Sequence, residues 1–199
     1  MQSDRFGLLP RPEYRNAKLS DIDKRSPSDL LKLAKQFAKM DRDSIYKGIN
    51  LYMYGSYRVG KTWMLHAIAN RLIELNEKSL FYVTAPILQM GVQKNLRLFD
   101  YPYLDYLCAV RFLMLDDLGQ EYRGAQSGFI ETTLEYLIRY RFNNARVTYI
   151  ATNGSLENIQ QIYGSSLFDF INGEYVIFNV EEKTNMSVLL RNDRLRKNK

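Results

Sequence analysis

The sequence contains one cysteine and one histidine among its 199 residues. A lone cysteine cannot form an internal disulfide, and these two residues cannot supply the ligands of the usual Cys/His zinc sites. Cys108 lies in the apolar stretch Leu107–Val110, so we expect a buried, inert thiol. His66 falls in a predicted helix, where we expect it on the surface rather than at a catalytic centre.

The sequence also lacks long hydrophobic runs. No apolar stretch approaches the ~20 residues that a membrane-spanning helix requires. The first residues, Met1–Arg5, lead into no apolar segment of the kind found in secretory signals. Together with the lone cysteine, these absences predict a cytoplasmic protein, or one in another reducing compartment. A hydrophobic content of 46% suits one globular domain with a buried core.

Basic residues outnumber acidic ones, giving a formal net charge of +6, but the excess is unevenly placed. Residues 1–25 contain prolines and scattered basic residues without helical periodicity, which predicts an extended basic arm. We expect the main domain at 26–185 and a basic tail at 186–199. Such a tail fits phosphate neutralisation on a nucleic acid and a simple solubilising role equally well.

The strongest motif is a complete phosphate-binding loop, G-x-x-x-x-G-K-T, at residues 55–62. Its glycines let backbone N–H groups approach phosphate oxygens. Lys61 brings a charge to the β- and γ-phosphates, and the Thr62 hydroxyl is placed to ligate Mg²⁺. The helix that begins after the loop adds a dipole that favours anions. The motif predicts ATP and Mg²⁺ as cofactors, with the nucleotide contacted by Gly55, Ser56, Tyr57, Arg58, Val59, Gly60, Lys61, Thr62 and Trp63.

A second motif, Arg111–Gly119, is an apolar run that ends in two aspartates. Such a run predicts a buried parallel strand, and its carboxyl end is where ligands bind in an open α/β sheet. We expect Asp116 to hold Mg²⁺, directly or through water, and Asp117 to orient or deprotonate the attacking water. Taken alone, the pair would equally suit a solvated acidic turn.

A third element, Arg146–Asn153, is a β-rich strand that ends in a Thr-Asn pair. Asn153 is predicted to hydrogen-bond the γ-phosphate or the attacking water. The alternative is that Asn153 and Gly154 form a simple turn dipeptide. The predicted catalytic set is therefore Lys61, Asp117 and Asn153.

Strand and helix patterns alternate along the chain. Strands are predicted at 50–54, 79–84, 111–116, 146–153 and 174–179, and helices at 27–40, 62–76, 127–143 and 158–163, with shorter helical segments after Pro86 and before residue 111. This alternation predicts an α/β fold in which helices cover both faces of a parallel sheet.

With these motifs in place, the chain resembles an AAA+ ATPase, a P-loop NTPase, and more narrowly the DnaC/DnaI helicase-loader and IstB-like branch. The segments that carry the resemblance are Leu9–Ala17 before the core, Tyr82–Leu88 at the second strand, the Walker B block Phe112–Glu121, and Arg139–Phe142 before sensor 1. The resemblance implies a five-stranded parallel sheet of order 5-1-4-3-2 flanked by helices, with no full C-terminal lid domain.

The resemblance also implies ATP-dependent self-assembly into a spiral or filament, single-stranded DNA held along its axis, and a replicative helicase as partner. By analogy, the helix after Thr84 is the insertion that approaches DNA. The candidate contacts there are Gln89, Gln93, Lys94 and Arg97.

The chain departs from the family pattern in three ways. Arg58 stands where the family's loop has glycine. The large N-terminal helicase-binding domain of the fuller loaders is not seen, so either residues 1–40 contact any partner or that contact is lost. No arginine occurs from 147 to 190, the region where the family places its arginine finger. The trans-acting cation is then expected from Arg123, Arg139 or Arg141, or hydrolysis is weak.

Four functions remain open from the sequence. The leading hypothesis is a compact loader that places a replicative helicase on single-stranded DNA. The second is an IstB-like regulator that forms an ATP-dependent filament on double-stranded DNA and recruits a transposase. A small-molecule kinase is a third reading, against which the Asp116-Asp117 and Thr152-Asn153 pairs argue. The missing arginine keeps a fourth open, a nucleotide-gated scaffold that hardly hydrolyses ATP.

Overall fold

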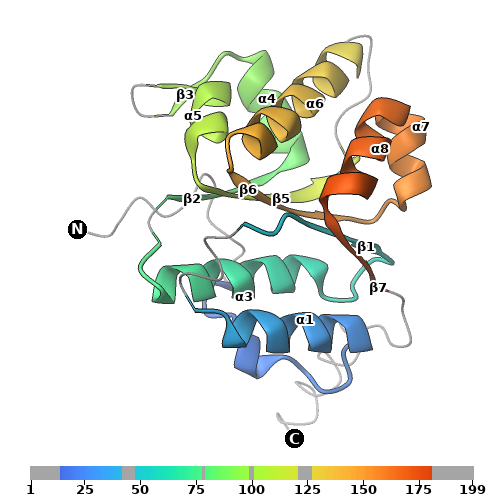
Figure 1. Ribbon diagram of the computed structural model, residues 1–199. Coiled ribbons are helices and arrows are strands. Elements are labelled where there is room, and N and C mark those ends of the chain that lie inside the picture. Colours follow the sequence, from blue (N-terminus) through green and yellow to red (C-terminus); the bar gives the residue numbers. More distant parts are fainter. Residues whose placement is uncertain (1–13, 42–47, 78, 99–100, 121–126, 181–199) are drawn as a thin grey trace, which may run out of the picture.

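The computed structural model describes residues 14–41, 48–77, 79–98, 101–120 and 127–180. A parallel sheet of five strands in the order β2-β5-β6-β1-β7 forms its centre (Figure 1). The strands are β1 (Leu51–Gly55), β2 (Leu80–Thr84), β5 (Phe112–Leu118), β6 (Val147–Thr152) and β7 (Val176–Val180). Counted one to five along the chain, these strands have the order 5-1-4-3-2, which confirms the predicted fold class. The described residues end with β7 and include no lid domain.

Helices cover both faces of the sheet (Figure 1). One face carries the 3-10 helix η2 (Leu19–Asp21), α1 (Ser28–Lys39) and α3 (Lys61–Glu74). The other face carries α4 (Ala85–Gln93), α5 (Tyr103–Ala109), α6 (Ser127–Asn143), α7 (Leu156–Tyr163) and α8 (Ser165–Glu174). A short antiparallel hairpin of β3 (Arg97–Leu98) and β4 (Tyr101–Pro102) lies between α4 and α5. The sheet is therefore the middle of three layers.

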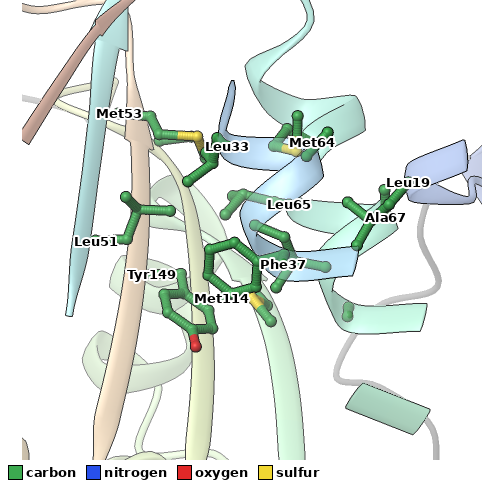
Figure 2. Packing of buried hydrophobic residues seen from close by; sticks show 14 of the residues in the cluster. Leu19, Leu33, Phe37, Leu51, Met53, Met64, Leu65, Ala67, Met114 and Tyr149 are labelled. Carbon is green, nitrogen blue, oxygen red and sulfur yellow. The ribbon is translucent and has the colours of Figure 1, made fainter. Parts of the chain in front are cut away.

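The sheet separates two hydrophobic clusters. In the first, Phe37 from α1 packs against Tyr149 of the sheet beside Met114 (Figure 2), and Met64 from α3 belongs to the same cluster. Leu113, the neighbour of Met114 in β5, belongs instead to the second cluster, beneath α4 to α8. Because successive side chains of β5 enter opposite clusters, the strand is apolar throughout, which explains the unbroken apolar run in the sequence.

The described part of the predicted N-terminal arm, residues 14–25, packs on α3 and α1. Ala17 and Leu19 are buried in the first cluster. Asn70 of α3 donates through Nδ2 to the carbonyl oxygens of Arg15, at 3.2 Å, and Ala17, at 2.8 Å. Residues 1–13 and the predicted tail at 186–199 lie outside the described residues.

The structure agrees with the burial predicted for the lone cysteine and contradicts the surface position predicted for the lone histidine. Cys108 is buried, as predicted, and burial raises the pKa of its thiol to about 11. The surface position expected for His66 is wrong, because the residue is buried in α3. Its ring is packed edge-to-face by Tyr14 and Tyr82, with ring centroids at 5.3 Å and 4.4 Å. The N-terminal segment thus covers a helix face that the sequence pattern assigned to solvent. No described helix combines the length and apolar character needed to span a bilayer.

Candidate nucleotide-binding site

The predicted phosphate-binding loop joins the carboxyl end of β1 to the first turn of α3. Gly55 and Gly60 have φ values of 141° and 108°, a region that favours glycine. A Cβ on Gly55 would lie 2.1 Å from the carbonyl oxygen of Val180 in β7, so a larger residue clashes with backbone. Tyr57 and Arg58 are exposed in the loop. The loop conformation therefore depends on glycine at both ends.

Lys61 begins α3, and its side chain folds back over the loop. Its Nζ donates to the carbonyl oxygens of Gly55, at 2.8 Å, and Ser56, at 2.6 Å. The same atom donates to Oδ1 of Asn153, at 3.0 Å. Asn153 follows β6, and β6 pairs with β1, so the ends of two neighbouring strands bring these groups together. A buried ammonium beside the phosphate-binding loop is a ready partner for an anion.

Asp116 is buried at the carboxyl end of β5, with 3% of its surface exposed. Its Oδ2 accepts a hydrogen bond from the Tyr82 hydroxyl at 2.5 Å, and its Oδ1 accepts from the backbone N–H of Asp117 at 3.0 Å. Burial raises the pKa of Asp116, and hydrogen bonds from Tyr82 and the Thr62 side chain oppose that rise. Thr62 and Asp116, the two predicted metal ligands, are therefore neighbours.

A bulge in β5 gives the two aspartates different surroundings. The register with β6 shifts between Leu115 and Leu118, and Asp117 has a φ of 57°. Beyond the bulge, the Thr152 hydroxyl donates to the carbonyl oxygen of Leu118 at 2.6 Å and holds the two strands together. Asp117 is only partly buried, whereas its neighbour Asp116 is buried. The adjacent carboxylates can therefore serve different chemical purposes.

The grouped residues fit a nucleoside triphosphate with Mg²⁺. Mg²⁺ usually takes one or two carboxylates and completes its shell with phosphate oxygens and water. Thr62 and Asp116 supply such a partial shell beside the Lys61 ammonium and the N-terminal end of α3. Within the described ranges, no cluster of three or more His, Cys, Asp or Glu residues offers a self-sufficient metal site. This agrees with a metal that arrives with phosphate.

Two neighbours of these residues gave no signal in the sequence. Tyr82 of β2 holds Asp116, and Gln120 donates through Nε2 to the Tyr57 hydroxyl at 3.3 Å, linking the Walker B side to the phosphate-binding loop. Thr84 pairs with Asp116, so Tyr82 lies two residues before the partner of Asp116 on the neighbouring strand, and its hydroxyl reaches the carboxylate. Only the register of β2 and β5, which the sequence does not contain, could have revealed this contact.

The three arginines predicted as trans-acting cations differ in burial and in whether the structure describes them. Arg141 has no exposed surface, and its guanidinium donates to the carbonyl oxygens of Leu107, Val110, Arg111 and Val147 and to the Thr148 hydroxyl. Since a neighbouring subunit cannot reach a fully buried and bonded group, the prediction for Arg141 is wrong. Arg123 lies outside the described residues.

Arg139 lies beside the segment where the family has its arginine finger. Its Nη2 donates to the carbonyl oxygen and the hydroxyl of Ser166, at 2.8 and 2.9 Å, in the first turn of α8. Its Nε donates to Glu135 at 2.8 Å, and its guanidinium lies 4.4 Å from the ring centre of Phe170. The side chain stays 36% exposed. Arg139 of α6 therefore places a positive charge against α8, a helix that contains no lysine or arginine of its own.

The predicted DNA contacts lie around the end of α4. Lys94 and Arg97 are exposed, as is Gln93. Gln89 is buried, with 5% of its surface exposed, so the prediction that it contacts DNA is wrong. In the hairpin, Leu98 pairs with Tyr101, whose side chain is 58% exposed. Two cations and an aromatic ring thus share one exposed region.

Comparisons with known proteins agree with this geometry. No family model matches the chain. The replicative helicase loader DnaI of Bacillus subtilis (strain 168) is 32% identical over 117 residues, which are 57% of this chain and 36% of that protein. The match thus spans about a third of the curated relative.

Solved structures extend the similarity over most of the fold. A crystal structure of DnaI matches with a TM-score of 0.70 at 25% identity, covering 92% of this chain and 96% of that one. The crystal structure of the DnaC helicase loader matches with a TM-score of 0.67 at 22% identity, covering 85% and 99%. The strand order, the loop at β1 and these similarities together support a DnaC/DnaI-like AAA+ fold for this chain.

Proposed function

We propose that the chain is an ATPase of DNA replication that self-assembles with ATP and loads a replicative helicase onto single-stranded DNA. The observation that carries the proposal is the meeting of Lys61, Asn153 and Asp116 at the carboxyl edge of the sheet. The similarity to the helicase loaders DnaI and DnaC supports the choice of function for this site.

The residues have separate roles in this proposal. Lys61 exchanges its bonds to Gly55 and Ser56 for the β- and γ-phosphates, and the backbone of residues 55–63 surrounds the phosphate chain. Thr62 and Asp116 hold Mg²⁺, which neutralises charge on the phosphates when bound. Asp117 orients the attacking water, and Asn153 contacts the γ-phosphate while remaining beside Lys61.

We further propose Arg139 as the cation that a neighbouring subunit supplies to the γ-phosphate. Its guanidinium is partly exposed and lies against the first turn of α8, within the segment that lacks an arginine. Its partners are two groups of Ser166 and the carboxylate of Glu135. An exposed ion pair of this kind contributes only ~0.2–1 kcal/mol, so a phosphate can compete for the guanidinium.

Mixing two inactive variants tests the role of Arg139. Arg139→Ala should lower ATP turnover of the assembled protein by about 10³-fold, and Asp117→Asn should also lower turnover while leaving ATP binding and assembly intact. In a mixture, Asp117→Asn subunits still carry Arg139 and can complete the intact sites of Arg139→Ala subunits, so turnover should partly return. Failure of the mixture to regain turnover, with both variants folded and assembled, would exclude Arg139 and favour the nonhydrolysing scaffold.

The exposed region around α4 and the β3–β4 hairpin is the proposed DNA contact. Lys94 and Arg97 would neutralise phosphates, and Tyr101 would stack on a base. The double variant Lys94→Ala/Arg97→Ala should weaken binding to single-stranded DNA and reduce the salt dependence of binding by about two phosphate contacts. Lys35→Ala is the matched control, since Lys35 is exposed on α1, across the sheet from α4 (Figure 1).

A loading assay tests the whole proposal. The purified protein is mixed with ATP, a hexameric replicative helicase from the same organism, and circular single-stranded DNA coated with binding protein. Unwinding of an annealed strand should require the unaltered chain and fail with Lys61→Ala.

Deletion of residues 1–25 should abolish binding to the helicase, because this segment is the proposed docking site. No loading, combined with ATP-dependent growth on double-stranded DNA, would support the transposase-recruiting alternative instead.

A further inference from the structure

One face of α3 connects the phosphate-binding loop to the N-terminal segment. Thr62, His66 and Asn70 follow at intervals of four residues, so they lie on the same side of the helix. Thr62 is beside Asp116, and Asn70 holds the backbone of residues 15 and 17. Between them, Nδ1 of His66 lies 3.0 Å from the Thr62 carbonyl oxygen. The metal-binding end of the site and the N-terminal segment thus share one helical face.

Tyr82 adds a second connection between the same two regions. Its ring packs against His66 with centroids 4.4 Å apart, and its hydroxyl donates to Oδ2 of Asp116 at 2.5 Å. On the other side of His66, the Tyr14 ring packs at 5.3 Å. Three aromatic rings therefore run from the N-terminal segment to the buried carboxylate, without a break.

We propose that Tyr82 is a positioning residue for Asp116, and that Tyr14 supports it through His66, so that docking of the N-terminal segment and Mg²⁺ binding strengthen each other. This inference rests on the proposed function, because it assigns Asp116 to the metal. A carboxylate that ligates Mg²⁺ keeps its orientation through hydrogen bonds to its remaining lone pairs. Each binding event then raises the affinity of the other by the same factor.

The chain carries its own reporter for the test. Trp63 is the only tryptophan and directly follows Lys61 and Thr62. Its fluorescence is followed while Mg²⁺ is titrated into the full chain with ATP. Tyr82→Phe keeps the ring against His66 and removes only the hydroxyl. The Mg²⁺ midpoint should rise about 10-fold, the lower end of the effect of removing such a supporting hydrogen bond, while ATP binding in EDTA stays unchanged.

Tyr149→Phe is the matched control. Tyr82 and Tyr149 pair with the same residue, Met114, from the two strands that flank β5. The Tyr149 ring is buried beside Phe37 and Met114 (Figure 2), in the same cluster as Tyr82. Removing its hydroxyl tests the general effect of losing a buried polar group from this face. We expect the Mg²⁺ midpoint of Tyr149→Phe to stay within twofold of the unaltered chain.

The N-terminal side is tested by Tyr14→Leu and by proteolysis. Tyr14→Leu should raise the Mg²⁺ midpoint about 5-fold, a modest value for coupled sites. Reciprocally, Mg²⁺ with ATP should slow tryptic cleavage between residues 15 and 25 in the unaltered chain, and Tyr82→Phe should remove most of that protection.

An unchanged Mg²⁺ midpoint in Tyr82→Phe, with normal Mg²⁺-dependent ATP binding in the unaltered chain, would overturn the coupling and leave the proposed function standing. Equal weakening of ATP binding with and without Mg²⁺ would also overturn it, since the hydroxyl would then serve the fold rather than the metal. Absence of Mg²⁺-dependent ATP binding in the unaltered chain would overturn the proposed function and this inference with it.

Discussion

Replacement of Arg141 separates a structural arginine from a trans-acting one. Its five hydrogen bonds reach acceptors in α5, in the connection from α5 to β5 and at the start of β6, and three of them are 2.7 Å or shorter. Burial lowers the pKa of Arg141 to about 9, so the guanidinium remains charged at neutral pH. Arg141→Met fills a similar volume but donates no hydrogen bond, and it leaves four carbonyl oxygens and the Thr148 hydroxyl buried without this donor.

The size of the effect follows from these acceptors. Each buried acceptor that loses its donor costs about 1–3 kcal/mol, but the losses are not additive. Removing a desolvated charge offsets part of the loss, so we expect a net destabilisation of about 4 kcal/mol, as when one partner of a buried charged network is removed. For a domain of this size, that should lower Tm by roughly 8–16 °C.

Thermal unfolding followed by circular dichroism, with ATP turnover measured well below Tm, is the assay. Arg139→Met is the control, because the residues that Arg139 contacts are not fully buried, so its replacement should cost less stability than that of Arg141. The two arginines should thus show different profiles: Arg141→Met loses more stability and keeps turnover per folded molecule, whereas Arg139→Met loses less stability and loses turnover. An Arg141→Met protein with unchanged Tm and no turnover would refute the structural assignment.

Three further predictions concern single positions. Gly55→Ala should destabilise the fold by on the order of 3 kcal/mol in urea unfolding, because its Cβ meets the Val180 carbonyl oxygen; a normal midpoint would contradict the described loop. Cys108 should resist thiol reagents at pH 8 until denaturant is added, since burial raises its pKa to about 11; rapid labelling of the folded chain would contradict this burial. The Ser166 hydroxyl, and then Arg139, hold the pKa of Glu135 below its ordinary value of 4.5. The resulting stability is present above pH 4.5 and is lost as the pH falls through the lowered pKa. The Tm gap between the unaltered chain and Glu135→Gln should therefore narrow in acid, and a gap that widens would contradict the sign.

Features set by local constraints could be predicted from the sequence. The phosphate-binding loop combines backbone conformations that require glycine with a lysine at the helix start, so Gly55, Gly60 and Lys61 identify it without a structure. The helix predicted at 127–143 matches α6, because its apolar spacing is regular over several turns. The sheet order came from the family resemblance, and the structure confirms it.

Features that depend on pairing between distant segments could not be predicted. The bond from Tyr82 to Asp116 requires the register of β2 against β5, and the burial of His66 requires the N-terminal segment to cover α3. Arg141 lies near the end of an amphipathic helix, where a charged residue ordinarily faces solvent. The burial of Arg141 depends on carbonyl groups in segments distant in the sequence, and the residues around Arg141 give no indication of these contacts.

The α6–α8 contact shows how a residue that is missing from one segment can be supplied by another. Ser166 lies in the first turn of α8, where the helix dipole is unfavourable for a cation. Glu135 compensates, because it accepts hydrogen bonds from both the Ser166 hydroxyl and Arg139. The Glu135 carboxylate thus stabilises the start of α8 and holds Arg139 there. The positive charge of Arg139 itself is unfavourable beside the N-terminal end of a helix. The guanidinium is held there by Glu135, two groups of Ser166 and the Phe170 ring. Because none of these three residues is fully buried, a phosphate can replace the contacts, which is the property that a cation shared between subunits requires.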